Sequence, residues 1–311
     1  MAILVATDFD AAEWAAWEPA LAAALPGEQL LRARGAVPDA AIDIVLLANA
    51  PAGSLRGLPA LRLLQSLWAG VERLLADPDL PAGVPLARMV DPAMAEAMAQ
   101  TALWAVLSVQ RDFLRYAAQQ RERRWQQHPQ RRADETKVGV LGLGAMGRAC
   151  AHKLAANGYA VSGWSRRPTQ LDGIATASGD AGLAALLGAS DIVVNLLPLT
   201  EATRGLFGAA TFARMPAGAS LVNLARGGHV VEADLLDALA CGRLCHAVLD
   251  VFEAEPLPSD HAFWRHPQIT LLPHIAAQTD PRSAAGVVAG NVRALREGRP
   301  LEHLVDRAAG Y

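Results

Sequence analysis

The sequence has few of the features that mark secreted, zinc-binding or disulfide-linked proteins. Its 311 residues contain three cysteines, Cys150, Cys241 and Cys245, without CxxC spacing. An odd number at this spacing favours reduced thiols over disulfides or a metal site. The start, MAILVATDFD, lacks a basic segment and reaches Asp8 too early for a signal peptide. We therefore expect a cytoplasmic protein that holds no metal.

Long apolar runs and an excess of positive charge are also missing. No run approaches the ~20 residues that a membrane span needs. The net charge is −3, and only two of the 28 basic residues are lysines. We therefore expect neither a membrane nor a nucleic acid as partner. The arginine-rich segment 119–132 could serve a polyanion, but a solvated helix face or a subunit contact is the favoured interpretation.

What the sequence does have is enough apolar material for two α/β domains. Hydrophobic residues make up 52% of the chain and charged residues 19%, which indicates a sizeable core. Short apolar runs alternate with helical patterns, and this alternation predicts parallel sheets. The first set of predicted strands covers 2–6, 28–33, 42–48 and 61–68, with a helix over 11–24. The second set covers 137–143, 160–165, 191–198, 220–226, 246–252 and 269–273.

Two further helices are predicted around the second set of strands. A long helix over about 92–125 begins where Asp91 can cap it and Pro92 can occupy its first turn. The last helix, 283–297, follows the final strand and could cross back to pack on the first domain.

A glycine-rich motif stands in the first strand–helix connection of the second set. VGVLGLGAMG, 138–147, contains G-x-G-x-x-G with a strand before it and a helix after it. Gly142 would permit the tight turn, Gly144 the approach of a pyrophosphate and Gly147 close packing of the helix. The N–H groups of Ala145 and Met146 would then face the phosphates. This context favours dinucleotide binding over a turn without a ligand.

The acid that usually follows such a motif is missing. In GWSRRP, 163–168, the tip of the next strand offers Ser165, Arg166 and Arg167 where Asp or Glu would hold a ribose hydroxyl. A 2′-phosphate would be repelled by a carboxylate, whereas guanidinium groups and a hydroxyl match it. The motif therefore predicts NADPH rather than NADH. Use of both cofactors, and arginines that merely face water, stay open as alternatives.

Three later segments each place one ionisable residue at the end of a predicted strand: NLARGG with Arg226, LDVFEAEPLP with Glu255 and LLPHIAAQT with His274. In an open α/β sheet these ends line the ligand site. An arginine can hold a carboxylate and polarise a ketone, and a histidine can donate a proton near neutral pH. A carboxylate beside that histidine stabilises the imidazolium. A lone histidine would more often be a structural one, but three complementary residues favour reduction of a 2-oxo acid.

These segments also resemble the D-isomer-specific 2-hydroxyacid dehydrogenase family. The resemblance covers essentially the whole chain, QSLWAGVERL included, and GWSRRP, NLLPLTEATRGLF, FWRHP and VDRAAGY are similar to its glyoxylate/hydroxypyruvate reductase A branch. It implies two Rossmann/flavodoxin-like parallel-sheet domains with a cleft between them, and a homodimer. The flavodoxin-like substrate domain would comprise 1–98 and 284–311, and the NAD(P)-binding Rossmann domain 99–283.

The resemblance also implies the roles of individual residues. Arg226, Glu255 and His274 would form the catalytic triad, with His274 as proton donor to a small 2-oxo acid that takes the pro-R hydride of NADPH. The backbone of Ala69, Gly70 and Val71, with Arg226, would hold the substrate carboxylate. Further cofactor contacts would come from Leu197, Pro198, Leu224, Asp250 and Ala276. The bulky Trp68 beside the carboxylate loop indicates a narrow pocket, and Gln278 departs from the smaller or apolar residues typical at its position.

Two other functions compete with reduction of glyoxylate to glycolate and of hydroxypyruvate to D-glycerate. One is a dehydrogenase for larger 2-oxo acids. The other is an NAD(H)-responsive scaffold without catalysis, since the family also includes corepressors. The complete triad speaks against the scaffold.

Overall fold

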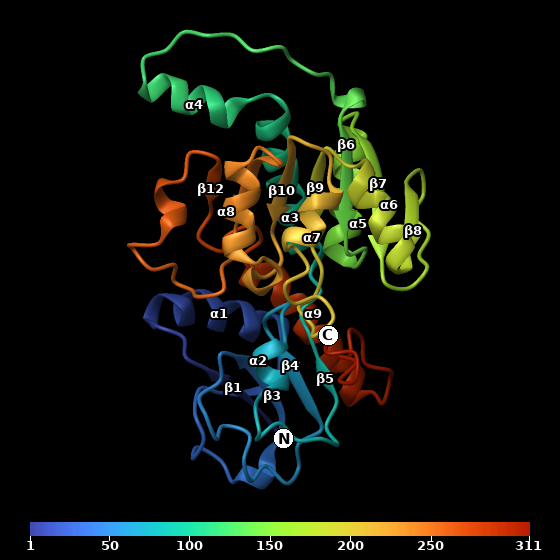
Figure 1. Cartoon of the computed structure of the whole chain (residues 1–311). Coiled ribbons are helices and arrows are strands. Elements are labelled where there is room, and N and C mark those ends of the chain that lie inside the picture. The colour runs from blue at the N-terminus through green and yellow to red at the C-terminus, as the bar shows by residue number, and fades with distance from the viewer. The chain divides into compact units, whose positions relative to one another are not determined.

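The computed structural model describes residues 1–311, and the chain divides into two compact units. Unit 1 comprises Met1–Ala93 and Thr279–Tyr311, and unit 2 comprises Met94–Gln278. Each unit is built on a parallel sheet with helices, as predicted (Figure 1). The domain limits predicted from the sequence, 98–99 and 283–284, fall a few residues later along the chain. The assignment of substrate to one domain and cofactor to the other stays a prediction.

The sheet of unit 1 has five parallel strands in the order β2-β1-β3-β4-β5. This is the order of flavodoxin-like folds. The strand β5 was not predicted, because its two residues carry no recognisable pattern. The strands are β1 (Ala2–Thr7), β2 (Gln29–Leu31), β3 (Ile42–Ala48), β4 (Leu63–Ser66) and β5 (Leu86–Ala87).

Two main helices, α1 and α9, pack against each other in unit 1 (Figure 1). Helix α1 (Ala11–Ala24) begins at a capping box formed by Asp10 and Glu13. Helix α9 (Pro281–Arg296) begins at Asp280, whose side chain accepts from the Arg282 N–H. The last helix therefore returns to the first domain, as predicted. The shorter elements are η1 (Asp39–Ala41) and α2 (Glu72–Leu75).

The sheet of unit 2 has seven parallel strands in the order β12-β11-β10-β9-β6-β7-β8. Counted along the chain from β6, this is the Rossmann order with one strand added at the end. The edge strand β8 was not predicted, because its residues, ATAS, are small and partly exposed. The strands are β6 (Lys137–Leu141), β7 (Ala160–Ser165), β8 (Ala175–Ser178), β9 (Ile192–Asn195), β10 (Ala219–Asn223), β11 (Leu244–Leu249) and β12 (Ile269–Leu271).

Both faces of this sheet are buried. Along β9, Ile192 and Val194 belong to one core cluster and Val193 to the other, as the two-residue period of a strand requires. The helices of unit 2 are α3 (Pro92–Gln110), α4 (Phe113–Arg121), α5 (Ala145–Ala156), α6 (Gly179–Ala189), α7 (Ala209–Arg214) and α8 (Glu232–Ala240), with 3-10 turns η2 (Ala133–Glu135), η3 (Gly227–His229) and η4 (Ala262–Arg265).

The single helix predicted over 92–125 is wrong in one respect, because the chain forms two helices there. Asp112 has a left-handed backbone, with φ 55°, and this conformation ends α3 and starts α4. The predicted start is as expected, since the Asp91 carboxylate accepts from the Ala93 N–H at 3.0 Å. In Figure 1, α4 and the segment after it stand away from the sheet of unit 2. None of the chain's helices is both long and apolar enough to cross a membrane.

Candidate active site

The ends of five strands lie in one row at the carboxyl edge of the sheet of unit 2. Asn195 is paired with Leu141 on one side and with Asn223 on the other. The row continues through Leu249 to Leu271. The glycine motif and the segments of Arg226, Glu255 and His274 follow these residues directly. The register therefore brings every predicted site element of unit 2 to one edge.

The glycine motif forms a tight turn between β6 and α5. Gly142 has φ 94°, and its N–H donates to the Trp164 carbonyl at the end of β7. A Cβ on Gly147 would lie 1.7 Å from the Gly142 carbonyl oxygen, so only glycine allows the first turn of α5 to approach the strand. A Cβ on Gly144 would meet no atom within 4 Å. The backbone at Gly144, with Ala145 and Met146 at the start of α5, is thus accessible to a phosphate group.

The segment predicted to hold a 2′-phosphate begins at Ser165, the last residue of β7, beside this turn. Ser165 is half-buried, while Arg166 and Arg167 are exposed. The Ser165 hydroxyl donates to the Arg167 carbonyl at 2.7 Å and closes a small turn. One basic residue that sequence reasoning missed is Arg148, which donates to the carbonyls of Leu143 and Gln170. Arg148 therefore ties the glycine turn to Gln170, three residues after Arg167.

The Arg226 segment packs closely on the segment that leads to Glu255. A Cβ on Gly227 would lie 1.9 Å from the Phe252 carbonyl carbon, so the two backbones can meet only at a glycine. The Arg226 carbonyl accepts from the Asn223 side chain at 2.9 Å, and its guanidinium donates to the Ala225 carbonyl at 2.6 Å. These contacts place Arg226 beside the Phe252–Glu255 turn.

Glu255 and His274 form a direct pair. The Glu255 Oε2 atom lies 2.7 Å from Nδ1 of His274, and Oε1 accepts from the Phe252 N–H at 2.9 Å. The carboxylate is therefore held by its own turn while it contacts the imidazole. Because Nδ1 faces Glu255, Nε2 is the ring nitrogen that this pair leaves available. This is the geometry of a histidine that donates a proton from Nε2.

Asp250, at the end of β11, holds the backbone of the His274 segment. Its carboxylate accepts from the N–H groups of Ile275 and Ala276 at 2.7 and 3.0 Å, and its carbonyl accepts from the His274 N–H at 2.9 Å. Burial raises the pKa of Asp250, and the two N–H groups partly offset this effect. His274 has a left-handed backbone, φ 54°, which these bonds stabilise. The predicted contact of Asp250 with a nicotinamide carboxamide stays a prediction.

Other predicted cofactor residues follow the same strand ends. Leu197 and Pro198 come after β9, and Leu224 after β10 donates its N–H to the Asn195 carbonyl. The Ala276 carbonyl accepts from the Thr101 hydroxyl of α3 at 2.8 Å. Sequence reasoning missed Thr101 and the buried Asn195, Asn223 and His229. A signal for the two asparagines exists, because both β9 and β10 end in the letters VN and a leucine follows each strand.

The predicted substrate loop, Ala69 to Val71, belongs to unit 1 and follows β4. Trp68, which precedes it, packs its ring against Phe9 and Trp17, with ring centroids 6.2 and 6.1 Å apart. Its carbonyl accepts from the Met89 N–H. The aromatic ring of Trp68 thus anchors the loop to the core of unit 1. Gln278 is the last residue of unit 2.

Comparison with known proteins identifies the relatives of this chain. Residues 103–276 match the model of the NAD-binding domain of D-isomer-specific 2-hydroxyacid dehydrogenases. A glyoxylate/hydroxypyruvate reductase A from Serratia proteamaculans (strain 568) is 41% identical over 308 residues, 97% of each chain.

Solved structures agree with these matches. A D-isomer-specific 2-hydroxyacid dehydrogenase from Xanthobacter autotrophicus Py2, in complex with NADPH and MES, has a TM-score of 0.95 and 40% identity, covering 100% of this chain and 99% of its own. An NADPH-dependent glyoxylate/hydroxypyruvate reductase from Sinorhizobium meliloti, in complex with NADP and sulfate, has a TM-score of 0.92 and 36% identity, covering 99% of both chains.

Proposed function

Because this chain belongs to the D-isomer-specific 2-hydroxyacid dehydrogenase family, we propose that it reduces small 2-oxo acids with NADPH. The substrates would be glyoxylate, giving glycolate, and hydroxypyruvate, giving D-glycerate. The observation that carries the proposal is the 2.7 Å pair of His274 and Glu255, at the same sheet edge as Arg226 and the glycine turn. The names of the relatives support the choice of substrates.

The residues of unit 2 fit a dinucleotide with a 2′-phosphate. The open backbone at Gly144 and the N-terminus of α5 suit a pyrophosphate. Ser165, Arg166 and Arg167, beside the glycine turn, suit a 2′-phosphate and include no carboxylate. Leu197, Pro198, Leu224, Asp250 and Ala276 would form the nicotinamide side. When bound, NADPH supplies the hydride.

In the reaction that we propose, the chain's own residues hold the substrate and supply the proton. The Arg226 guanidinium binds the carboxylate of the 2-oxo acid. The carboxylate contacts of the Ala69–Val71 backbone stay a prediction. As the carbonyl carbon accepts hydride, the carbonyl oxygen gains negative charge, and Nε2 of protonated His274 gives its proton to that oxygen. Glu255 holds the imidazole in position and stabilises its protonated form through Nδ1.

The experiment that tests this function is a comparison of initial rates of NADPH and NADH oxidation. The substrates are glyoxylate, hydroxypyruvate and a short series of larger 2-oxo acids. We expect turnover of the two small acids with NADPH in clear preference to NADH. Turnover of the larger acids without turnover of the two small ones would favour a dehydrogenase for larger 2-oxo acids. NADPH binding without any turnover would favour the scaffold function.

We also propose that the protein is a cytoplasmic homodimer. Large apolar side chains are exposed on α3, on α4 and in the segment after α4. Helix α4 and this segment stand away from the sheet of unit 2 (Figure 1). Trp104 is 41% exposed, Phe113 47% and Trp125 94%. Exposure of such large apolar side chains favours a surface that contacts another protein over a surface that contacts only water. Sedimentation equilibrium is expected to give twice the chain mass of 32.8 kDa. A mass of one chain would contradict the dimer.

A further inference from the structure

Three buried polar side chains lie between two loops of the carboxyl edge and have no part in the mechanism above. Asn195 ends β9, Asn223 ends β10, and His229 lies in η3; each is fully buried. A buried polar group stays in a core only with hydrogen-bond partners, and its partners reveal what it holds in place.

The partners of the two asparagines connect the ends of β9 and β10. The Asn195 amide donates to the Asn223 side-chain oxygen at 2.9 Å, and the Asn223 amide donates to the Arg226 carbonyl at 2.9 Å. The Asn195 side-chain oxygen accepts from the Leu197 N–H at 3.3 Å. One asparagine thus holds the loop with Leu197 and Pro198, and the other holds Arg226.

His229 closes the connection on the other side of these loops. Its Nδ1 atom lies 3.1 Å from the Arg226 carbonyl oxygen and its Nε2 atom 3.3 Å from the Pro198 carbonyl oxygen. Carbonyl oxygens only accept, so a neutral imidazole donates one of these two hydrogen bonds and only the protonated imidazole donates both. The imidazole therefore spans the distance between the two loops and contacts the backbone of both.

We propose that His229 is a positioning residue that fixes Arg226 relative to the loop of Leu197 and Pro198. Asn195 and Asn223 hold the same two loops at the strand ends, so that the five contacts, together with the peptide bond from Leu197 to Pro198, form a closed ring. This inference rests on the proposed function, which assigns Arg226 to the substrate and Pro198 to the cofactor. Loss of the ring would misplace the two binding partners without removing a group that touches either.

Two conservative variants separate the two contacts of the ring. The side-chain amide of asparagine can take the place of Nδ1, and that of glutamine can take the place of Nε2. His229→Asn keeps the link to Arg226, so we expect an unchanged KM for hydroxypyruvate and a KM for NADPH raised about tenfold. His229→Gln keeps the link to Pro198, so we expect the opposite pattern. His229→Leu loses both links, and kcat/KM is expected to fall about 100-fold.

The control is His246→Gln, the same change at a half-buried histidine of β11 whose Nε2 contacts the Thr270 hydroxyl. At pH 7.5 it is expected to leave both KM values unchanged. Thermal unfolding of every variant separates a loss of stability from a loss of positioning. The proposal is overturned if the Asn and Gln variants shift both KM values by equal factors, or shift only the unfolding temperature. If His229→Leu does not fold, the contrast between the KM values of His229→Asn and His229→Gln still tests the proposal.

A failure of the proposed function gives a different result. In that case wild type reduces no 2-oxo acid, and NADPH binding, followed by tryptophan fluorescence, replaces the kinetics. His229→Asn is then still expected to weaken NADPH binding about tenfold, with His229→Gln close to wild type. Equal NADPH affinities in both variants would contradict the inference whatever the substrate is.

Discussion

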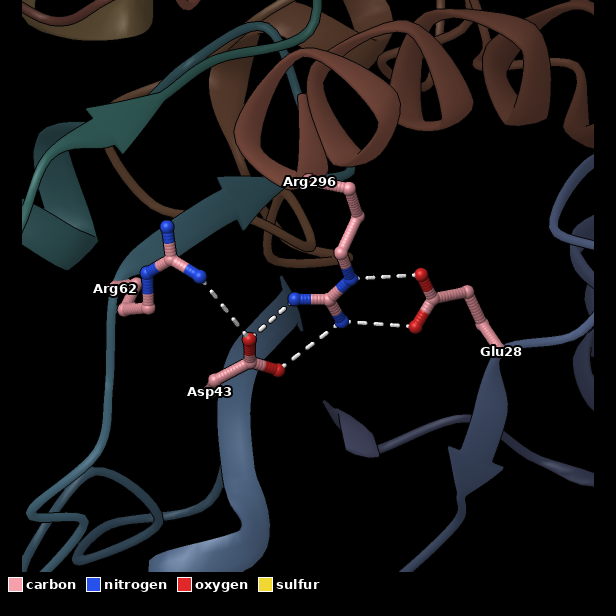
Figure 2. A network of polar contacts seen from close by, with 4 residues as sticks. All are labelled: Glu28, Asp43, Arg62 and Arg296. Atoms are coloured by element: carbon pink, nitrogen blue, oxygen red, sulfur yellow. Dashed lines mark hydrogen bonds and ion pairs between the residues drawn. The ribbon is translucent and has the colours of Figure 1, made fainter. Parts of the chain in front are cut away.

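Each unit contains a network of polar side chains, and the two networks lie at opposite ends of the strands of their sheets. In unit 1, Arg296 at the end of α9 forms ion pairs with Glu28 and with Asp43, near the start of β3, and Arg62 approaches the same aspartate at 3.9 Å (Figure 2). In unit 2, the ring of Asn195, Asn223 and His229 lies at the carboxyl ends of β9 and β10. The first network is charged, and the second consists of amides, carbonyls and an imidazole.

The two networks differ in charge, and they also differ in the part of the structure that each one stabilises. Arg296 binds Glu28 in a bidentate fork, with both distances 2.8 Å, and Asp43 is fully buried beneath it. This network connects α9 to β3 within unit 1 and lies away from the edge where ligands bind in parallel sheets. The ring in unit 2 fastens loops at that edge. We infer that the amino ends of the strands serve stability and the carboxyl ends serve function.

The largest expected effect is on catalysis at the carboxyl edge. His274→Ala removes the proposed proton donor, and kcat for hydroxypyruvate is expected to fall at least about 1,000-fold. The side chain is 53% exposed, so the unfolding temperature and the NADPH affinity are expected to stay near those of wild type. Steady-state rates and thermal unfolding check both. A kcat of His274→Ala close to that of wild type would contradict the assignment of His274 as proton donor.

The second prediction concerns stability at the amino ends. Arg296→Leu leaves Asp43 buried without its main partner, and the free energy of unfolding is expected to fall by about 3 kcal/mol. Activity per folded molecule is expected to be unchanged. The matched control is Arg299→Leu, which breaks an exposed pair with Glu297 and should cost less than about 1 kcal/mol. Equal losses in urea unfolding of the two variants would contradict the comparison.

The third prediction separates the cofactors at the carboxyl edge. Replacing both Arg166 and Arg167 with alanine removes the charges that we assign to the 2′-phosphate. The KM for NADPH is expected to rise about 10- to 100-fold, because charge-assisted contacts to a phosphate are lost. NADH serves as the internal control, since it lacks that phosphate, and its KM should change little. Equal changes for both cofactors would show that the two arginines face water.

The smallest effect is a difference in acid sensitivity between the units. Burial lowers the pKa of His246 in β11 to about 4, and hydrogen bonds from Arg296 lower the pKa of Glu28. Both shifts mean that the unfolded chain binds more protons, so stability is lost as the pH falls. For His246 the loss runs from about pH 6.5 down to 4, and for Glu28 it begins below about 4.5.

Hydrogen exchange at pH 7.5, 5.5 and 4 measures this difference. After correction for the intrinsic exchange rate at each pH, we expect lower protection in β11 at pH 5.5 and lower protection in α9 only at pH 4. His246→Gln should abolish the first change and leave the second. Simultaneous loss of protection in both elements at pH 5.5 would contradict the assignment of the two windows.

Much of the fold could be predicted because its signals are local. Strand β3 and helix α1 have the bounds that their patterns predict, and Asp91 caps α3 as its position before Pro92 indicates. The two-residue β5 and the break at Asp112 carry no such signal, because sheet pairing and backbone geometry beyond the local sequence decide them.

The candidate site shows the same limit. Arg226, Glu255 and His274 could be proposed from residue type and position at strand ends. The bond between Glu255 and His274 depends on strand register, which places residues 19 apart beside each other. His229 carries no signal in the sequence, and only its two carbonyl contacts reveal the ring.

The most direct test of the central claim is the transfer of deuterium from NADPH labelled at the pro-R position of nicotinamide C4 to glyoxylate, with the glycolate analysed by mass spectrometry. Hydride transfer at the carboxyl edge of unit 2 predicts one deuterium on carbon in each glycolate molecule from wild type. His274→Ala should form the same labelled product far more slowly. Glycolate without deuterium, or no glycolate while NADPH stays bound, would contradict the account.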